Sequence, residues 1–253
     1  MGLFDKKFCG VCGQKIGLFG NRKLEDGNLC KDCAAKLSPW FSERRSSTLD
    51  EIKAQLAYRE ENKEKVAAFR PTRTLGKSTK VLIDEDAGKF LVTSANNWRD
   101  ANPDVLDFAD VTGCEIDINE SKHELKQKGP DGKDVSYNPP RYEFDYDFYC
   151  DIRVNHPYFN QIRFRINPST IRSETTGGAM RFGKITPPLT IEYQECKETG
   201  NEIKEALLNV RRQVREAVAA AAAPKKSVVC PFCGATTTPT EGGCCEYCGA
   251  PVN

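Results

Sequence analysis

Hydrophobic and polar residues alternate most regularly between Tyr142 and Val154, where every second side chain is aromatic, aliphatic or cysteine. A period of two places alternate side chains on opposite faces of a β-strand, so one face of this segment is predicted to be buried. The shorter run Ile162–Ile166 repeats the alternation and is predicted to pair with the first as a hairpin.

Other apolar runs predict further strands. The segments Thr79–Ile83 and Lys89–Thr93 flank a turn-forming stretch and predict a second hairpin, and a third strand pair is predicted for Val105–Phe108 with Val111–Asn119. The polar stretch Lys126–Arg141 contains Gly-Pro-Asp-Gly and Pro-Pro and predicts an exposed loop. A last strand is predicted at Leu189–Tyr193.

Two segments have the period of a helix. Thr48 and Glu51 form a capping-box signature, and the apolar positions that follow at spacings of three and four predict a connecting helix that ends before Pro71. These apolar positions are Leu49, Ile52, Leu56, Val66 and Phe69. A second amphipathic helix is predicted from the stripe Ile203, Leu207, Val210, Val214 and Val218.

Cysteines bracket this middle region. The pairs Cys9/Cys12 and Cys30/Cys33 stand at the start of the chain, and Cys230/Cys233 and Cys245/Cys248 at its end. A two-residue spacer lets both sulfurs of a pair point at one ion, and a second pair completes a tetrahedral shell. We therefore predict two structural zinc ions, in preference to disulfides, a redox pair or an iron–sulfur cluster. Cys244 is predicted to lie outside the second site, because only Cys245 keeps the two-residue spacer.

The patterns together predict five segments. These are an N-terminal zinc ribbon (1–48), a connecting helix (49–70), a β domain closed by a helix (71–215), an alanine-rich helix end or linker (216–227) and a C-terminal zinc ribbon (228–253). The predicted fold class is α+β, with several antiparallel strands, as a barrel or sandwich, followed by one amphipathic helix.

Two resemblances extend this interpretation. The opening, CGVCGQKIGLFGNRKLEDGNLCKDCAAKLSP, resembles the four-cysteine zinc domain of bacterial proteins known as domain of unknown function 4428. The resemblance implies Cys9, Cys12, Cys30 and Cys33 as ligands in a bacterial cytoplasmic protein, and it implies no activity. The middle region is similar to the bacterial pleckstrin-homology-like group in its element order and in stretches such as KVLIDEDAGKFLV.

Charge and composition reduce the number of functions that the sequence favours. The formal net charge is +1, and two zinc tetrathiolates would bring it to about −3 (+1 − 8 + 4), unlike a strongly basic nucleic-acid binder. We expect a reducing, cytoplasmic location, because the sequence shows no signal-like apolar stretch and the cysteines are spaced as metal ligands. The C-terminal segment 227–253 contains no arginine and only acidic charge, which favours protein contact over phosphate contact.

The remaining polar and cysteine residues predict no catalytic centre. Asp145, Asp147 and Asp151 lie on one strand face and are predicted to form exposed ion pairs with Arg163 and Arg165. The dispersed cysteines Cys114, Cys150 and Cys196 are predicted to be buried apolar residues.

Three functions are compatible with the sequence, and an enzyme is the least favoured alternative. The first is a non-enzymatic zinc-binding adaptor that contacts an unidentified protein partner. The second is a sensor of anionic membrane surfaces, for which the candidate basic residues are Arg70, Arg73, Lys77 and Lys80. The third, which we expect less, is nucleic-acid binding through the N-terminal ribbon.

Overall fold

The computed structural model describes residues 7–176, 180–181, 184–185, 190–222, 227–240 and 242–252. The chain divides into two compact units, Met1–Arg211 and Arg212–Asn253. None of the helices in these described ranges combines the length and the apolar character needed to cross a membrane.

The N-terminal module of the first unit has a small core of its own, which contains three of its four cysteines together with Leu24, Leu29 and Leu37. Ile52 from the following helix completes this core. The secondary structure consists of β1 (Arg22–Lys23), β2 (Asn28–Leu29), α1 (Lys31–Ala34) and the 3-10 turn η1 (Glu43–Ser46). β1 and β2 pair as a short antiparallel hairpin.

Helix α2 (Leu49–Ala68) begins at the predicted capping box: the Thr48 hydroxyl accepts from the Glu51 amide, and the Glu51 carboxylate accepts from the Thr48 amide. The buried face of α2 contains more than the predicted apolar stripe. Gln55, Arg59 and Asn62 are buried between Ile52 and Val66, at spacings of three and four. The helix therefore buries polar side chains at positions where apolar side chains would be expected.

The β domain contains two open antiparallel sheets of four strands each. The first sheet has the order β3-β4-β5-β6, and its central strands β4 and β5 form the predicted second hairpin. Its strands are β3 (Arg73–Leu75), β4 (Lys80–Asp84), β5 (Lys89–Thr93) and β6 (Leu106–Asp107). β4 and β5 are buried on both faces, because α2 and Trp98 from α3 (Trp98–Ala101) cover one face and the main core covers the other.

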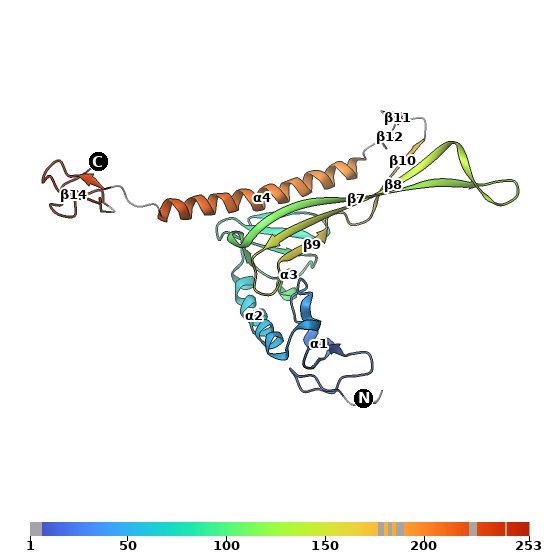
Figure 1. Ribbon diagram of the computed structural model, residues 1–253, viewed down its shortest axis with the longest axis horizontal. Coiled ribbons are helices and arrows are strands. Elements are labelled where there is room, and N and C mark those ends of the chain that lie inside the picture. Colours follow the sequence, from blue (N-terminus) through green and yellow to red (C-terminus); the bar gives the residue numbers. More distant parts are fainter. Residues whose placement is uncertain are drawn as a thin grey trace. The chain divides into compact units, whose positions relative to one another are not determined.

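The second sheet is organised around the long strand β8, as Figure 1 shows. β7 (Val111–Lys128) pairs with one edge of β8 (Asp134–Val154), and β9 (Gln161–Arg165) and β10 (Ile171–Thr176) pair with the other edge. The predicted alternation is confirmed: Phe144, Tyr146, Phe148, Cys150, Ile152 and Val154 are buried, and the residues between them are more exposed. Two-residue strands β11 (Met180–Arg181) and β12 (Lys184–Ile185) follow.

Helix α4 (Ile191–Ala222) packs onto this sheet through Tyr193, Ile203, Ala206 and Leu207. Gly200 lies against Ile116 of β7, and a Cβ atom at this position would be only 3.1 Å from the Ile116 side chain. Ile203 and Leu207 confirm the start of the predicted stripe. The side chains of Val210, Val214 and Val218 lie outside the described residues.

Three sequence-based predictions of secondary structure are wrong. Lys126–Arg141 is mostly strand, because β7 and β8 continue as a two-stranded ribbon to a tight turn at 129–133. Residues 191–193 are the first turn of α4, and Thr190 caps them by accepting from the Tyr193 amide at 3.2 Å; Leu189 lies outside the described residues. β6 pairs with β5 instead of β7, because the 3-10 turn η2 (Phe108–Asp110) separates β6 from β7.

The second unit contains the described end of α4 and a small ribbon with strands β13 (Val228–Val229) and β14 (Thr236–Thr237). Its core is formed by Cys230, Cys245 and Val252, with Val228 packed against them. So small a core leaves metal binding as the main source of order in this module.

Candidate metal centres

The first metal centre combines a turn with a helix start. In the turn, the Gly13 amide donates to the Cys9 carbonyl at 2.8 Å, and the Cys9 amide donates to the Gln14 carbonyl at 2.9 Å. Gly13 has a φ of 71°, a conformation that glycine adopts without a steric penalty. The turn therefore brings the sulfurs of Cys9 and Cys12 to one side of the backbone.

The second pair of this centre stands at the start of α1. Cys30 is the N-cap residue, and its Sγ accepts from the Cys33 amide at 3.4 Å. This hydrogen bond holds the Cys30 sulfur at the first turn of α1, beside Cys33.

Both cysteine pairs of the second metal centre form the same kind of turn as Cys9–Gly13. The Gly234 amide donates to the Cys230 carbonyl, and the Gly249 amide donates to the Cys245 carbonyl, each at 2.9 Å. Both glycines have φ near 70°. Three of the four cysteine pairs thus share one backbone geometry, which the recurring Cys-x-x-Cys-Gly pattern already indicates.

The sulfur spacing fits zinc. In each group of four cysteines the Sγ atoms all lie within 4.8 Å of one another. The Sγ–Sγ distances include 3.7 Å for Cys12–Cys30 and 3.6 Å for Cys230–Cys248. A tetrahedron with Zn–S bonds of about 2.3 Å has edges of about 3.8 Å, whereas a disulfide bond is about 2.05 Å long. The two groups are therefore positioned to bind two zinc ions.

The charges of the sulfurs support the same conclusion. Burial opposes ionisation of Cys9, but amide donors from Cys12, Cys30 and Val11 outweigh it and lower the pKa of this thiol to about 6. Burial and the neighbouring sulfurs raise the pKa of Cys33. Four sulfurs this close cannot all ionise unless a cation compensates their charge, and a divalent metal ion supplies that charge.

Of the cysteines outside the two groups, Cys244, Cys114 and Cys150 behave as predicted, whereas Cys196 is less buried than predicted. Cys244 is not a member of the second group, and its Sγ lies 3.6 Å from the Gly242 carbonyl oxygen. Cys114 and Cys150 are buried on neighbouring strands with their Sγ atoms 3.8 Å apart. Cys196 is partly buried at the edge of the main core.

Large apolar side chains are exposed on both metal-binding modules. Phe232 and Tyr247, which each precede the second cysteine of a pair, are both 71% exposed. On the N-terminal module, Leu18 and Phe19 are 82% and 89% exposed. These residues lie where the two modules face solvent, and the sequence-based prediction did not single them out.

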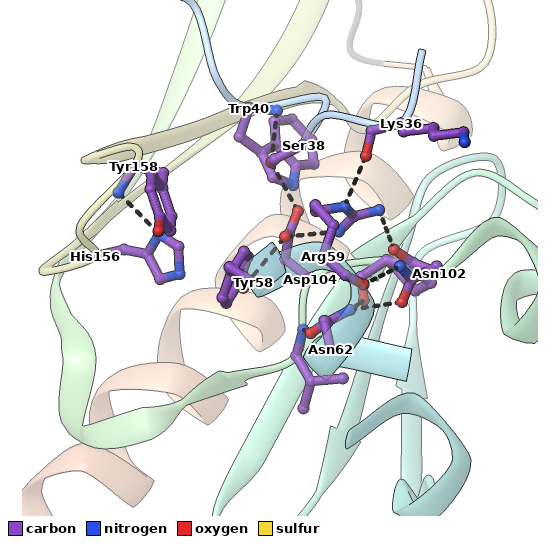
Figure 2. Close-up of polar contacts among 12 residues, drawn as sticks. Lys36, Ser38, Trp40, Tyr58, Arg59, Asn62, Asn102, Asp104, His156 and Tyr158 are labelled. Atoms are coloured by element: carbon purple, nitrogen blue, oxygen red, sulfur yellow. Dashed lines mark hydrogen bonds and ion pairs between the residues drawn. The ribbon is translucent and has the colours of Figure 1, made fainter. Parts of the chain in front are cut away.

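Figure 2 shows a buried polar network that joins the N-terminal module to the β domain. The Asp104 carboxylate accepts hydrogen bonds from Ser38 at 2.8 Å, Tyr58 at 3.2 Å and Arg59 at 2.7 Å. Arg59 also donates to the Lys36 carbonyl at 3.2 Å and to the Asn102 carbonyl. The Arg59 and Asp104 side chains are 7% and 0% exposed, so this is a buried ion pair with its hydrogen bonds largely satisfied.

The neighbouring residue Asn62 extends the network. Its amide nitrogen donates to the Pro103 carbonyl at 2.8 Å, and its amide oxygen accepts from the Val105 amide at 3.0 Å. The segment 102–105, which leads into β6, is thus held by α2 on one side and by Ser38 of the N-terminal module on the other.

Two of the three aspartates in the acidic row on β8 pair with arginines as predicted, and Asp145 has a different partner. Arg163 lies 3.5 Å from Asp151 and 2.6 Å from Asp117 of β7, and Arg165 lies 2.7 Å from Asp147. Asp145 is paired with Arg172 of β10 at 3.3 Å. The row is therefore part of a cross-strand ion-pair network.

Basic side chains gather in one place on the N-terminal module. Arg22, Lys31 and Arg44 line a hollow of about 370 Å³ beside α1. Burial, together with repulsion from Arg22 and Arg45, lowers the pKa of Arg44. Of the four residues suggested for lipid contact, Lys77 forms an ion pair with Glu195 at 2.6 Å.

Comparisons with known proteins identify one module only. No significant match was found among curated proteins or among solved structures. Residues 7–55 match the family model of domain of unknown function 4428, a stretch that contains the whole first metal centre and the beginning of α2.

Proposed function

We propose that this protein is a non-enzymatic zinc-binding adaptor, whose two metal-binding modules present apolar side chains to protein partners. The proposal depends on the exposure of Phe232 and Tyr247. Two aromatic rings that are each 71% exposed, on a module with almost no core, contribute little to its folding. Aromatic residues exposed on a rigid turn are typical of protein-binding surfaces.

The charge of the C-terminal module supports a protein partner. The segment 227–253 contains no lysine or arginine, and its charged side chains are Glu241 and Glu246. A surface that binds nucleic acid normally neutralises phosphate groups with basic residues. An aromatic patch that lacks basic residues is better matched to an apolar or basic surface of a protein partner than to nucleic acid.

The β domain is proposed to be pleckstrin-homology-like, in keeping with its antiparallel strands followed by one C-terminal helix. In this proposal it acts in the cytoplasm as a rigid support to which the N-terminal module is fixed by the Arg59–Asp104 network. The pairing of Lys77 with Glu195 weakens the alternative in which this domain binds anionic lipid. Sedimentation with vesicles of phosphatidylcholine and phosphatidylserine separates the two, since a lipid sensor would pellet with the anionic vesicles.

The test is a quantitative pull-down from the native cell with the zinc-loaded full chain. Phe232→Ser with Tyr247→Ser should reduce recovery of specific partners at least about tenfold, because central aromatic contacts carry much of the binding energy. Zinc content should stay unchanged, because neither side chain is a ligand. Val135→Ser is the matched control, an exposed apolar residue of the β domain. Equal recovery by the double variant and the control would contradict the proposal for this module.

A second candidate function is nucleic-acid binding by the N-terminal module, favoured by the hollow between Arg22, Lys31 and Arg44. Binding of this kind weakens steeply with salt, because phosphate contacts release counterions. A gel-shift titration with single- and double-stranded DNA at about 50 and 200 mM salt would show it. Absence of a shift at the lower salt concentration, or a shift that Arg22→Ala with Arg44→Ala leaves unchanged, would remove this candidate.

A further inference from the structure

Strand β7 leaves one edge of its sheet open. In the sheet order β10-β8-β7 it is the outermost strand, and within the described ranges of the chain it pairs only with β8. Its outer part, residues 119–128, is exposed except for Leu125, and it runs beyond the other strands as one half of the ribbon in Figure 1. Residues 111–128 include no proline, so every outward-facing amide along this edge can donate to another strand.

The opposite edge of the ribbon is different. β8 contains Pro139 and Pro140, neither of which has an amide hydrogen. The register between the two strands also jumps here, from Leu125 opposite Arg141 to Lys126 opposite Ser136. The residues that bulge out belong to β8, so β7 stays continuous. The ribbon therefore offers one edge for pairing and blocks the other.

The side chains along the open edge alternate in charge. Glu120, Lys122, Glu124 and Lys126 occupy alternate positions and so share one face of the strand. None of the four forms an ion pair with another residue in the described part of the chain. Other charged residues of β7 do have such partners: Glu115 pairs with Arg153, Asp117 with Arg163, and Lys128 with Asp134.

This alternation is complementary to itself in one antiparallel register. If two β7 strands pair about a two-fold axis at His123, Lys122 faces Glu124 and Glu120 faces Lys126, and each pair occurs twice. Moving the axis by one residue in either direction places like charges opposite each other. Opposite charges directly across antiparallel strands stabilise the pairing and like charges destabilise it, so the sequence selects this register.

We propose that the chain forms a two-fold dimer through antiparallel pairing of the β7 edges over residues 118–128. The two sheets then continue into one another, with main-chain hydrogen bonds supplying attraction and the four charge pairs supplying specificity. In this register Ile118 of one copy faces Lys128 of the other, which is the last β7 residue before the partner's turn. The paired stretch is about 34 Å long, which keeps the two sheet cores at opposite ends of it.

The test uses charge reversal in the zinc-loaded full chain, followed by sedimentation equilibrium. Lys122→Glu places glutamates at both 122 and 124, and Glu124→Lys places lysines at both. Each variant alone should raise the dimer Kd about tenfold or more, because two attractive pairs become repulsive. An equimolar mixture of the two should form a heterodimer with a Kd within about threefold of the wild-type value, because opposite charges face each other again.

Two controls accompany this test. Lys133→Glu makes the same charge change in the turn of the same ribbon, outside the paired residues, and should leave the Kd unchanged. Lys122 also lies 4.0 Å from the ring centre of Tyr142. Glu124→Lys leaves that contact intact, so both single variants must weaken the dimer if charge pairing is the cause. A wild-type chain that stays monomeric up to about 0.5 mM, roughly the weak end of specific association, would overturn the proposal, as would variants that dimerise equally well alone.

Discussion

Replacing Asp104 by asparagine tests the buried network that fixes the N-terminal module to the β domain. The change keeps the size of the side chain but removes its charge, so the Arg59 guanidinium, which is 7% exposed, is left without a counterion. Ser38 and Tyr58 lose a charged acceptor at the same time. Breaking a buried ion pair by removing one partner costs about 3–5 kcal/mol.

The cost is measurable by thermal unfolding of the zinc-loaded protein. A loss of 1 kcal/mol lowers Tm by about 2–4 °C in a domain of this size, so Asp104→Asn should lower it by about 6–20 °C. Asp50→Asn is the matched control, because Asp50 forms an exposed pair with Lys53 at 3.2 Å. Exposed pairs of this kind contribute about 0.2–1 kcal/mol, and Tm should fall by less than about 4 °C.

A double substitution separates charge from packing. Arg59→Met combined with Asp104→Leu removes both charges, and it should recover a substantial part of the stability lost in Asp104→Asn, because no uncompensated charge is left buried. If Asp104→Asn unfolds within about 1 kcal/mol of the Asp50 control, the network does not hold the module in place and the argument from burial is refuted.

The other predictions concern the metal ions, a turn and the pH dependence. Native mass spectrometry should detect two zinc ions per chain, and one after Cys9→Ser with Cys12→Ser; a brown, iron-containing product would contradict the zinc assignment. Hydrogen exchange in that variant should rise across the N-terminal module and the start of α2, while β8 stays protected; a loss of protection throughout the chain would show that the β domain depends on the first metal ion. Gly76→Ala should destabilise the protein by at least about 1–3 kcal/mol in chemical denaturation, because φ is 90° and its Cβ would lie 2.3 Å from a carbonyl oxygen. Gly88→Ala, with φ of 66° and open space, should cost less, and equal costs would exclude the close contact as the cause. Burial lowers the pKa of His156 below its ordinary 6.5. The neutral imidazole therefore contributes its full stability above about pH 6.5. This stability is lost as the pH falls from there through the lowered pKa of the folded state, because the unfolded chain binds the proton first. His156→Phe should therefore flatten the fall in Tm between about pH 7 and 5, and an unchanged slope would assign that fall to other groups.

The metal centres and the hairpins were predictable because their signals are local. A two-residue spacer followed by glycine determines the Cys9, Cys230 and Cys245 turns almost by itself, and the alternation in β8 reflects one buried face. The same reasoning failed for the ribbon at 126–141, because both of its faces meet solvent and no apolar alternation arises. The residues 191–193 alternate like a strand, but Thr190 caps them as a helix, and Ile191 is 77% exposed.

The sequence does contain an indication of the buried polar residues of α2, but a search for apolar periodicity alone cannot detect it. Gln55, Arg59 and Asn62 continue the spacing of three and four between Ile52 and Val66, which identifies them as core positions once polar residues are admitted. Asp104 and Asn102, the partners of Arg59 and Asn62, lie 45 and 40 residues away in the chain, so no local sequence pattern predicts these contacts. The alternating charges of β7 are visible in the sequence, but only the structure shows that they lie at a sheet edge.

The prolines of β8 also limit how far such strand pairing can extend. A sheet that is open on both edges can add copies without end, which is how fibrils grow. Pro139 and Pro140 of β8 have no amide hydrogen to donate to an added strand, so a copy that uses its β7 edge has no comparable second edge in the ribbon to offer a third copy. The ribbon is thus built for an assembly that closes at two chains, and substituting both prolines would remove a barrier to polymerisation.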